Sequence, residues 1–407
     1  MKIALCAPAD LHALARFCGR DTTQAALGLG GTATTPLLCE FLRRGHRVTL
    51  YTLSKDVARD CLYQWDNLRI FVGRFRARHL AGTYYWPEIE FLRKTIRADA
   101  PGFVHAHWTY EFALGALRSG VPTLTTIHDL PWNVLRYYRD AHRAARVLMA
   151  CEVGLRGKYF SAVSSAAARH FARYIRPGAE IAIIPNGLSH EVFAMAKQGR
   201  VGNQRAVTFA TVLQGWSRRK NAQAALQAFG LVRRELTNMR LLMFGSEYEP
   251  NGPAQRWAEA HALDRSVVFA GPIAHNNLLQ RISEDVDVVV HPSRDEAFSM
   301  AALETLGLRK ALIAGETTPG MREMLGQGGG MLVDVQDPAA IAQAMLHLAN
   351  NADYRRHLAN HGFERALHHY RLSTIADEYE NFYRAMLMGA TASCHDGHAE
   401  SRLSADV

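Results

Sequence analysis

The stretch His-Pro-Ser-Arg-Asp-Glu-Ala-Phe-Ser-Met-Ala-Ala-Leu-Glu, residues 291–304, decides how this chain is expected to fold. Residues 286–290 directly before it are apolar apart from Asp287, which is typical of a buried parallel strand. Ser299 is placed to cap a helix whose apolar residues face inward. The sequence therefore predicts a strand, a polar loop and a helix N-terminus. Such an arrangement binds anions because the first helical N–H groups have no partner within the helix.

Two carboxylates frame this predicted site. Glu296 lies in the loop before the helix, and Glu304 follows after seven intervening residues. A carboxylate accepts hydrogen bonds at two oxygens, which suits the vicinal hydroxyls of a sugar. The alternative for Glu296 is that it only complements the dipole of the helix, since acidic residues are common near helix starts.

Length and composition set the class of protein. A chain of 407 residues with 48% hydrophobic residues predicts two globular domains. The six cysteines form no Cys-x-x-Cys pair, so we expect neither zinc nor a disulfide framework, and a reducing cytoplasm fits. No apolar run reaches the roughly 18 residues that span a bilayer, and the apolar run at residues 3–6 is too short for a signal peptide.

The charge is uneven along the chain. Residues 1–186 contain 25 Lys and Arg against 14 Asp and Glu, whereas the remainder contains 22 against 24. A basic half indicates an anionic partner. Because the arginines there do not form a strong aromatic-basic motif, the sequence does not indicate nucleic acid. A merely solvated basic face remains the alternative.

The first half begins with a strand–helix–strand pattern. A strand at 3–8 is followed by a long loop ending in Gly30-Gly31, a helix at 32–44 and a strand at 48–52. This pattern predicts a Rossmann-like unit. The glycines do not spell Gly-x-Gly-x-x-Gly, and the loop is too long for a dinucleotide turn. A nicotinamide-dependent oxidoreductase is therefore a weak rival.

Three histidines follow further predicted strands. Residues 103–107 and 123–127 are strand candidates, which places His105, His107 and His128 at carboxyl ends, where open α/β sheets bind ligands. No further metal ligand is close in sequence, so we expect no metal site. The pair Asp285 and Asp287 matches an Asp-x-Asp metal motif but lies at the opposite end of a strand, and we discard it.

The second half restarts the alternation of strands and helices. Its strand candidates are 206–212, 240–244, 266–270, 286–290, 311–314 and 331–333. A Pro-Asn-Gly turn at 185–187 marks the junction, and the polar residues at about 194–204 are typical of a linker. In the first turn of this half, Arg218, Arg219 and Lys220 oppose the dipole of the following helix. A diphosphate would compensate these cations.

Together these motifs resemble the retaining glycosyltransferases of family 4, glycosyl transferases group 1, over roughly residues 1–385. The resemblance implies an α/β chain with the GT-B fold, in which two Rossmann-like doubly wound parallel-sheet domains face across a cleft. Residues 1–193, with a crossover helix at about 372–388, would bind the acceptor. Residues 205–371 would bind a nucleotide sugar, and residues 389–407 would form a disordered tail.

The resemblance also implies roles for individual residues. Glu304 would bind ribose, and Glu296 would bind and orient the sugar. Lys220 matches the family's pyrophosphate-binding lysine, but Trp216 stands where an arginine usually follows glycine, so Arg218 or Arg219 would substitute. The resemblance implies further donor or sugar contacts from the side chain of His128 and from backbone groups of Phe298, Ser299, Met300, Gly30 and Gly31. For the two glycines, a plain turn that needs positive φ is an equal alternative.

The function implied is transfer of a sugar from a nucleotide-diphosphate sugar to a glycan or lipid-linked acceptor, with retention and without metal or cofactor. Polysaccharide or glycolipid biosynthesis at the cell surface is the family's commonest use. The basic half would then contact an anionic membrane at its inner, cytoplasmic face. The rival hypothesis is a GT-B binding or scaffold protein without turnover, for which Trp216 is the best support.

Overall fold

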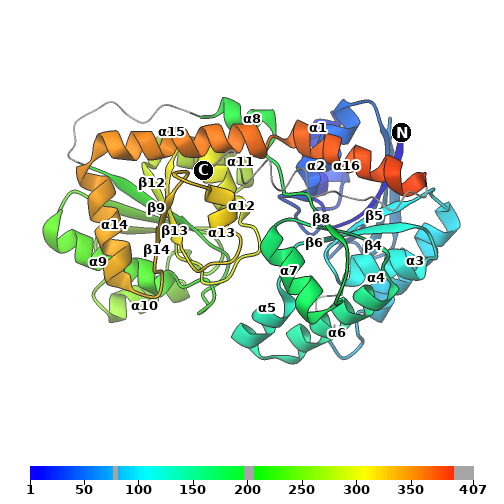
Figure 1. Cartoon of the computed structure of the whole chain (residues 1–407), viewed down its shortest axis with the longest axis horizontal. Coiled ribbons are helices and arrows are strands. Elements are labelled where there is room, and N and C mark those ends of the chain that lie inside the picture. The colour runs from blue at the N-terminus through cyan, green and yellow to red at the C-terminus, as the bar shows by residue number, and fades with distance from the viewer. Residues whose placement is uncertain (77–80, 197–205, 389–407) are drawn as a thin grey trace. The chain divides into compact units, whose positions relative to one another are not determined.

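The computed structural model describes residues 1–76, 81–196 and 206–388 of the chain. These residues form two compact units (Figure 1). The first unit comprises Met1 to Gly187 together with the C-terminal helix that begins at Leu372. The second unit runs from Leu188 to Arg371. Each unit is a parallel sheet covered by helices, so the predicted α/β class is confirmed. Among the described residues, no helix is both long enough and apolar enough to cross a bilayer.

The first unit contains an eight-stranded sheet in the order β3-β4-β2-β1-β5-β6-β7-β8. Its pairs are parallel except for the edge strand β3, which is antiparallel to β4. The strands are β1 (Lys2–Cys6), β2 (Arg47–Ser54), β3 (Cys61–Trp65), β4 (Leu68–Arg74), β5 (Val104–His107), β6 (Thr123–Ile127), β7 (Tyr159–Ala162) and β8 (Ile181–Ile183). Every residue of β5 and β6 is buried, as expected for central parallel strands covered on both faces.

The helices of the first unit alternate with these strands in chain order. They are α1 (Leu11–Phe17), α2 (Thr34–Arg43), α3 (Trp86–Asp99), α4 (Glu111–Arg118), α5 (Pro131–Tyr138), α6 (Ala141–Arg156), α7 (Ser165–Tyr174) and the returning α16 (Leu372–Leu387), with a short 3₁₀ turn at Thr22–Gln24.

Three elements of the first unit were not predicted. The stretch taken as a long loop before Gly30 contains α1, which Asp10 caps by accepting a hydrogen bond from the Ala13 amide. Seven residues are too few to show a clear helical period. The hairpin of β3 and β4 lies at the edge of the sheet, where β3 is only partly buried and carries a weak apolar signal.

The second unit contains a six-stranded parallel sheet in the order β11-β10-β9-β12-β13-β14. The strands are β9 (Thr208–Val212), β10 (Arg240–Phe244), β11 (Val267–Gly271), β12 (Val288–His291), β13 (Ala311–Gly315) and β14 (Met331–Val333). The helices are α8 (His190–Ala194), α9 (Ala222–Glu235), α10 (Pro253–Ala260), α11 (His275–Asp285), α12 (Met300–Gly307), α13 (Met321–Leu325), α14 (Pro338–Asn350) and α15 (Ala352–His369).

The strand order of the second unit predicts where its ligand site lies. The order reverses between β9 and β12, which are neighbours in the sheet but far apart in the chain. Val288 and Val290 pack into the core on one face, and Val289 packs into the core on the other. In such doubly wound sheets the loops after the two strands at the reversal form the binding crevice. The fold therefore directs attention to residues 213–221 and 292–299.

The boundary between the units lies slightly earlier than predicted. Helix α8 belongs to the second unit, because Val192 packs in one core with Leu306 and Leu188 lies against Gly307. The break therefore falls after Gly187, whereas the sequence placed it after residue 193. Most of the predicted linker at about 194–204 and the whole predicted disordered tail at 389–407 lie outside the described residues.

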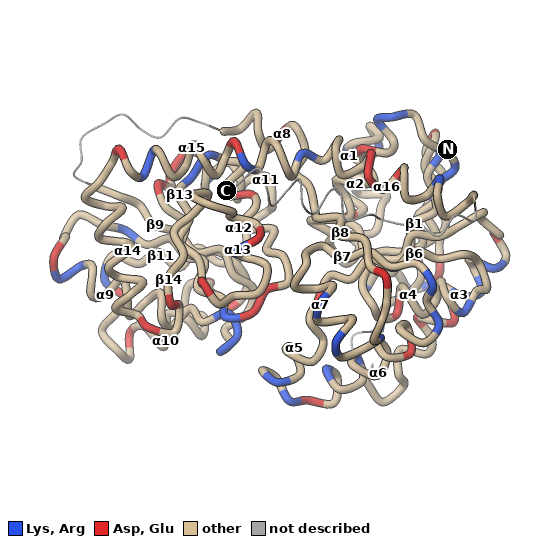
Figure 2. The backbone as a smooth tube through the Cα atoms, viewed as in Figure 1, with Lys and Arg blue, Asp and Glu red and all other residues tan. Residues whose placement is uncertain are grey.

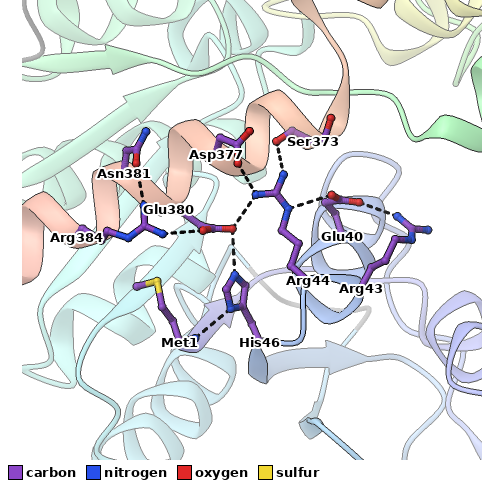
Figure 3. A network of polar contacts seen from close by, with 10 residues as sticks. All are labelled: Met1, Glu40, Arg43, Arg44, His46, Ser373, Asp377, Glu380, Asn381 and Arg384. Carbon is purple, nitrogen blue, oxygen red and sulfur yellow. Dashed lines mark hydrogen bonds and ion pairs between the residues drawn. The ribbon is translucent and has the colours of Figure 1, made fainter.

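Helix α16 is held in the first unit by a polar network (Figure 3). The Arg44 guanidinium, directly after α2, donates to Asp377 at 2.6 Å, to Glu380 at 2.8 Å and to the Ser373 carbonyl at 2.6 Å. His46 and Arg384 each lie 3.0 Å from Glu380. Glu380 is therefore a nearly buried carboxylate. It receives hydrogen bonds from the turn after α2 and from Arg384 in its own helix, and it fixes α16 to α2.

We predict that Glu380→Gln destabilises the attachment of α16 by about 1–2 kcal/mol at pH 7, because it removes charge-assisted hydrogen bonds. Partial burial alone would raise the pKa of Glu380, but the bonds from His46 and Arg44 hold this pKa below its ordinary value. A carboxyl with a lowered native pKa stabilises the fold above its unfolded pKa of about 4.3, and this contribution is lost as the pH falls further. Hydrogen exchange of the α16 amides at pH 7 and pH 4 measures the effect locally.

Asp377→Asn is the matched control, because Asp377 also contacts Arg44 but its side chain is 65% exposed. We expect a change within about 0.5 kcal/mol for this variant. Equal effects of the two substitutions would show that Glu380 does not anchor the helix.

Candidate functional site

The predicted helix N-terminus after β12 is present. Helix α12 begins at Met300, and the Ser299 hydroxyl accepts a hydrogen bond from the Ala302 amide at 3.2 Å. Ser299 is buried, Met300 is partly buried against the core, and the Phe298 ring lies edge-on to Tyr370 at 5.7 Å. The side chains of Phe298 and Met300 thus serve packing, and a contact of their backbone N–H groups with a donor stays a prediction.

Glu296 is a buried carboxylate surrounded by cations. Its exposed fraction is 9%, Lys220 Nζ donates to Oε1, and Arg219 Nη2 lies 3.8 Å from Oε2. Burial alone would raise its pKa, but the charges of Lys220 and Arg219 outweigh burial and lower the pKa of Glu296 to about 2. Glu296 is therefore ionised at neutral pH and accepts hydrogen bonds but cannot donate one.

His291, at the end of β12, lies beside this carboxylate. Its Nε2 is 3.8 Å from Glu296 Oε1 and makes no hydrogen bond with any described residue. Burial lowers the pKa of His291 to about 4, and the neighbouring Lys220 and Arg219 act in the same direction. The ring is therefore neutral at pH 7 and adds no charge to the site.

The turn between β9 and α9 brings the cations to Glu296. Arg219 Nε donates to Asp295 at 2.9 Å, and the Arg294 amide donates to the Arg219 carbonyl at 2.9 Å. Asn221 adopts φ +57° at the start of α9, and its Nδ2 donates to the carbonyls of Pro292 at 3.0 Å and Val335 at 2.7 Å. The two loops at the strand reversal are thus held together by direct hydrogen bonds.

Arg218 and Arg219 differ in their exposure and in their contacts. Arg218 is exposed, whereas Arg219 is partly buried and contacts both Asp295 and Glu296. Trp216 packs against Tyr248 and Trp257 with ring centroids 6.0 and 5.6 Å away, and its amide donates to the Glu247 carboxylate. Trp216 therefore fills an aromatic cluster, and the geometry favours Arg219 as the second cation of the site.

Glu304 is almost fully buried on α12, with 4% of its surface exposed. His275 Nε2, at the start of α11, lies 2.7 Å from Glu304 Oε1. Neither His275 nor Asp295 was singled out from the sequence. Asp295 directly precedes Glu296, and His275 follows the turn after β11. Their positions after strands of one parallel sheet were the available signal.

In the first unit, Gly30 and Gly31 lie just before α2 with φ +82° and +139°. A Cβ on Gly31 would come within 2.8 Å of the Pro8 carbonyl oxygen and 2.7 Å of Thr34 Oγ1, whereas a Cβ on Gly30 would meet no atom within 4 Å. Gly31 thus needs to be glycine for space as well as for conformation. The turn accounts for both glycines, and a contact with substrate stays a prediction.

His128 follows β6 as predicted. Its Nε2 lies 2.9 Å from His107 Nδ1, and its ring stacks on Trp108 with centroids 4.3 Å apart. Burial lowers the pKa of His128 to about 3, so the ring is neutral at pH 7. Hydrogen bonding by His128 is therefore compatible with this environment, whereas a positive charge on its ring is not.

The described residues contain no group of three His, Cys, Asp or Glu side chains that could hold a metal ion. The Asp-x-Asp pair has other contacts: Asp287 accepts a hydrogen bond from the Thr208 amide at 2.9 Å, and Asp285 accepts one from Arg281 at 2.9 Å. Asp287 thus connects the start of β9 to the start of β12, whereas Asp285 pairs within α11.

Two doubly wound domains in one chain, with a cationic turn and a capped helix at the reversal in the second, define a GT-B glycosyltransferase. Solved structures of this class share the fold. The sucrose-phosphate synthase of Thermosynechococcus elongatus gives a TM-score of 0.76 at 18% identity, covering 96% of this chain and 100% of that one. HepE of Anabaena, solved in complex with UDP-glucose, gives 0.67 at 14% identity, covering 95% and 100%.

Sequence comparison identifies the family. The profile described as Glycosyltransferase Family 4 matches residues 31–192, and the profile described as Glycosyl transferases group 1 matches residues 204–351. The D-inositol 3-phosphate glycosyltransferase of Corynebacterium diphtheriae is 24% identical over 88% of this chain and 90% of its own length. The chain belongs to glycosyltransferase family 4, as the motifs indicated.

The match to a second relative is shorter. The protein of the same name from Corynebacterium urealyticum is 26% identical over 51% of this chain, and the match spans 52% of that relative. The chain thus spans about half the length of one curated relative and nearly the whole length of the other.

We predict that Lys220→Met weakens the binding of UDP and of inorganic pyrophosphate by about 1.5–3 kcal/mol, the scale of a hydrogen bond to a charged group. Arg219→Met should act in the same direction, because both cations contact Glu296. Isothermal titration calorimetry measures both affinities.

Arg218→Met is the matched control in the same turn, and we expect it to change affinity by no more than about 0.5 kcal/mol. Lys220→Arg keeps the charge beside the buried Glu296, so this variant tests the site if Lys220→Met does not fold. If Arg218→Met weakened binding as much as Lys220→Met, the assignment of the site cations would be wrong.

Proposed function

We propose that this glycosyltransferase moves a sugar, with retention at the anomeric carbon, from a nucleotide-diphosphate sugar to a glycan or lipid-linked acceptor. The observation that carries this proposal is the ionised Glu296 held by Lys220 and Arg219 beside the N-terminus of α12. One place thus offers a carboxylate for sugar hydroxyls and cations with helix N–H groups for phosphates.

The helix end in this site favours an anionic leaving group. Lys220 and Arg219 are matched by Glu296 and Asp295, so the four side chains are together neutral. A diphosphate adds negative charge at the end of α12, where unpaired N–H groups and the helix dipole stabilise it. Stabilisation of charge on the leaving group is usually the largest single contribution to catalysis of this kind.

Glu304 suits the ribose of the donor. Its buried carboxylate retains acceptor capacity beyond the contact with His275, and two ribose hydroxyls would bind such a group. Support for a nucleotide sugar also comes from HepE, which was solved with UDP-glucose. His128 would contact the transferred sugar from the first unit.

The proposed reaction needs no nucleophile from the protein. The bond from the anomeric carbon to the β-phosphate oxygen breaks while the acceptor oxygen attacks from the same face. The proton of the acceptor hydroxyl passes to an oxygen of the departing diphosphate. Lys220 and Arg219 hold that diphosphate in place, and Glu296 keeps the sugar ring oriented. No metal or cofactor enters the proposal.

The acceptor has two candidate classes. A glycan or lipid-linked acceptor in cell-surface polysaccharide or glycolipid synthesis is the first. The second is a phosphorylated polyol, favoured by the relatives named for inositol 3-phosphate and by a structural neighbour named for sucrose phosphate. Acceptors of both classes belong in the first assays.

The surface of α5 and α6 supports contact with an anionic membrane. Helix α5 carries Arg136, and α6 carries Arg143, Arg146 and Arg156 (Figure 2). Between them α6 exposes Leu148 and Leu155, which are 62% and 86% exposed, and α5 exposes Trp132. Apolar side chains that insert among lipid chains, flanked by cations that meet anionic headgroups, are typical of peripheral attachment. We propose the cytoplasmic face of the membrane as the working location.

We predict that the protein co-sediments with liposomes containing anionic phosphatidylglycerol and not with neutral phosphatidylcholine liposomes. Leu155→Asp should reduce the bound fraction at least about threefold, because it places a charge where an apolar group would insert. Leu62→Asp, at an exposed position of β3, is the matched control. Equal and negligible binding to both liposomes would exclude the membrane contact.

We predict that the protein releases nucleoside diphosphate from one donor in a panel of UDP-, GDP- and ADP-sugars, with a chelator present, and that Glu296→Gln abolishes the release. Glutamine keeps the shape of the side chain but removes the charge that binds the cations. Proton NMR of the product should show the same anomeric configuration as in the donor.

Glu304→Ala separates donor binding from chemistry. We expect it to weaken nucleotide binding by about 1.5–3 kcal/mol, and unchanged affinity would exclude the ribose contact. Binding of a nucleotide sugar without release or transfer to either acceptor class would instead favour the rival hypothesis of a binding protein without turnover.

A further inference from the structure

His107 and His128 form a pair of imidazoles in the first unit. His107 ends β5 and is 2% exposed, and His128 directly follows the neighbouring strand β6. Nδ1 of His107 lies 2.9 Å from Nε2 of His128. No individual role was predicted for His107, so this contact connects it unexpectedly to the proposed sugar-binding residue.

Both rings are neutral, because burial lowers the pKa of each. A neutral imidazole carries one proton, so the pair has two arrangements. Either His107 donates from Nδ1 to Nε2 of His128, or His128 donates from Nε2 to Nδ1 of His107. In the first arrangement the proton of His128 is on Nδ1, and in the second Nδ1 of His128 is bare.

The other nitrogen of His107 distinguishes these arrangements. His107 Nε2 is buried and makes no hydrogen bond with any described residue. If His128 donated, this nitrogen would carry a proton and become a buried N–H without an acceptor. If His107 donates, the nitrogen is only an unused acceptor. Orphaned buried N–H groups are rarer than unused acceptors, so the first arrangement is favoured.

We propose that His107 is a positioning residue that holds His128 in the Nδ1–H tautomer. His128 then presents a fixed N–H donor, and the fitting ligand atom is an acceptor oxygen of the transferred sugar or of the leaving phosphate. The imidazole cannot take a proton from the acceptor in this state. This inference rests on the proposed function for the presence of a sugar beside His128, but the tautomer itself does not.

The surroundings keep both rings in place. His105 forms hydrogen bonds with the Tyr383 hydroxyl at 2.6 Å and with the Thr126 hydroxyl at 2.7 Å. The centroids of the His105 and His107 rings lie 4.1 Å apart. The Trp108 amide donates to the Thr126 carbonyl at 3.0 Å, although Trp108 has φ +65°, an unusual conformation for an aromatic residue. The indole then stacks on His128 with 21° between the planes.

Long-range ¹H–¹⁵N spectra of the full-length protein with ¹⁵N-labelled histidine test the tautomer directly, without any ligand. The His128 signals are assigned by comparison with a His128→Asn sample. We expect a proton on Nδ1 of His128 in the native protein, although an imidazole in water favours the Nε2–H form. A proton on Nε2 of His128 would overturn the proposal.

Two variants of His107 extend the test. His107→Asn keeps a donor near the place of Nδ1 and should retain the Nδ1–H signal of His128. His107→Leu keeps the bulk without a donor and should shift His128 to the Nε2–H form. The kcat of both variants is measured with the donor and acceptor identified in the activity assays. We expect kcat to be about fivefold to tenfold lower for His107→Leu, the scale of one lost hydrogen bond, and near-native for His107→Asn.

These outcomes separate positioning from structural support. A purely structural role would leave the tautomer of His128 unchanged in a folded Leu variant, and this result would overturn the proposal. If the Leu variant does not fold, the spectrum of the native protein still decides the tautomer. If no donor is turned over, the proposed function fails while the tautomer result stands.

Discussion

The burial of one negative charge organises the second unit. Glu296 is almost removed from water, and an isolated carboxylate there would be strongly unfavourable. Lys220 and Arg219 make it tolerable, and they can reach it only because the turn after β9 lies beside the loop after β12. The charge therefore depends on the strand reversal, and Asn221 fixes the reversal by donating to carbonyls of two other loops. The strand order of the fold therefore determines which charged groups meet in the site.

The first unit uses buried polar groups in a different way. His105, His107 and His128 are neutral and are held by hydrogen bonds instead of ion pairs. A neutral ring that cannot change its protonation near pH 7 offers a fixed donor or acceptor, which suits orientation of a ligand more than proton transfer. Glu296 can thus act through its charge, and His128 can act only through hydrogen bonds. Family membership gives the type of reaction, and the environments of these groups indicate what each can do.

Much of the fold was accessible from the sequence. The parallel strands are short apolar runs, and nearly all of them were predicted, because strands covered on both faces have an unmistakable composition. Ser299 was recognised as a cap from its place before an apolar helix, and the structure confirms it. Two of the missed elements have weak local signals: α1 has only seven residues, and β3 lies half-buried at a sheet edge. Strand β4 was also missed, although most of its residues are buried. The unit boundary was misplaced because α8 packs by contacts with Gly307 and Leu306 that no local pattern reveals.

The sequence by itself determined the kinds of group available: two carboxylates with seven residues between them, three consecutive cations before a helix, and histidines at the ends of strands. These features follow from spacing along one element, which has a fixed geometry. The tertiary structure decided which groups meet. Only folding separates the exposed Arg218 from Arg219, brings His275 to Glu304 and pairs His107 with His128. Those pairings join residues from different strands and helices, and the ionisation of each group depends on burial, which is a property of the packed whole.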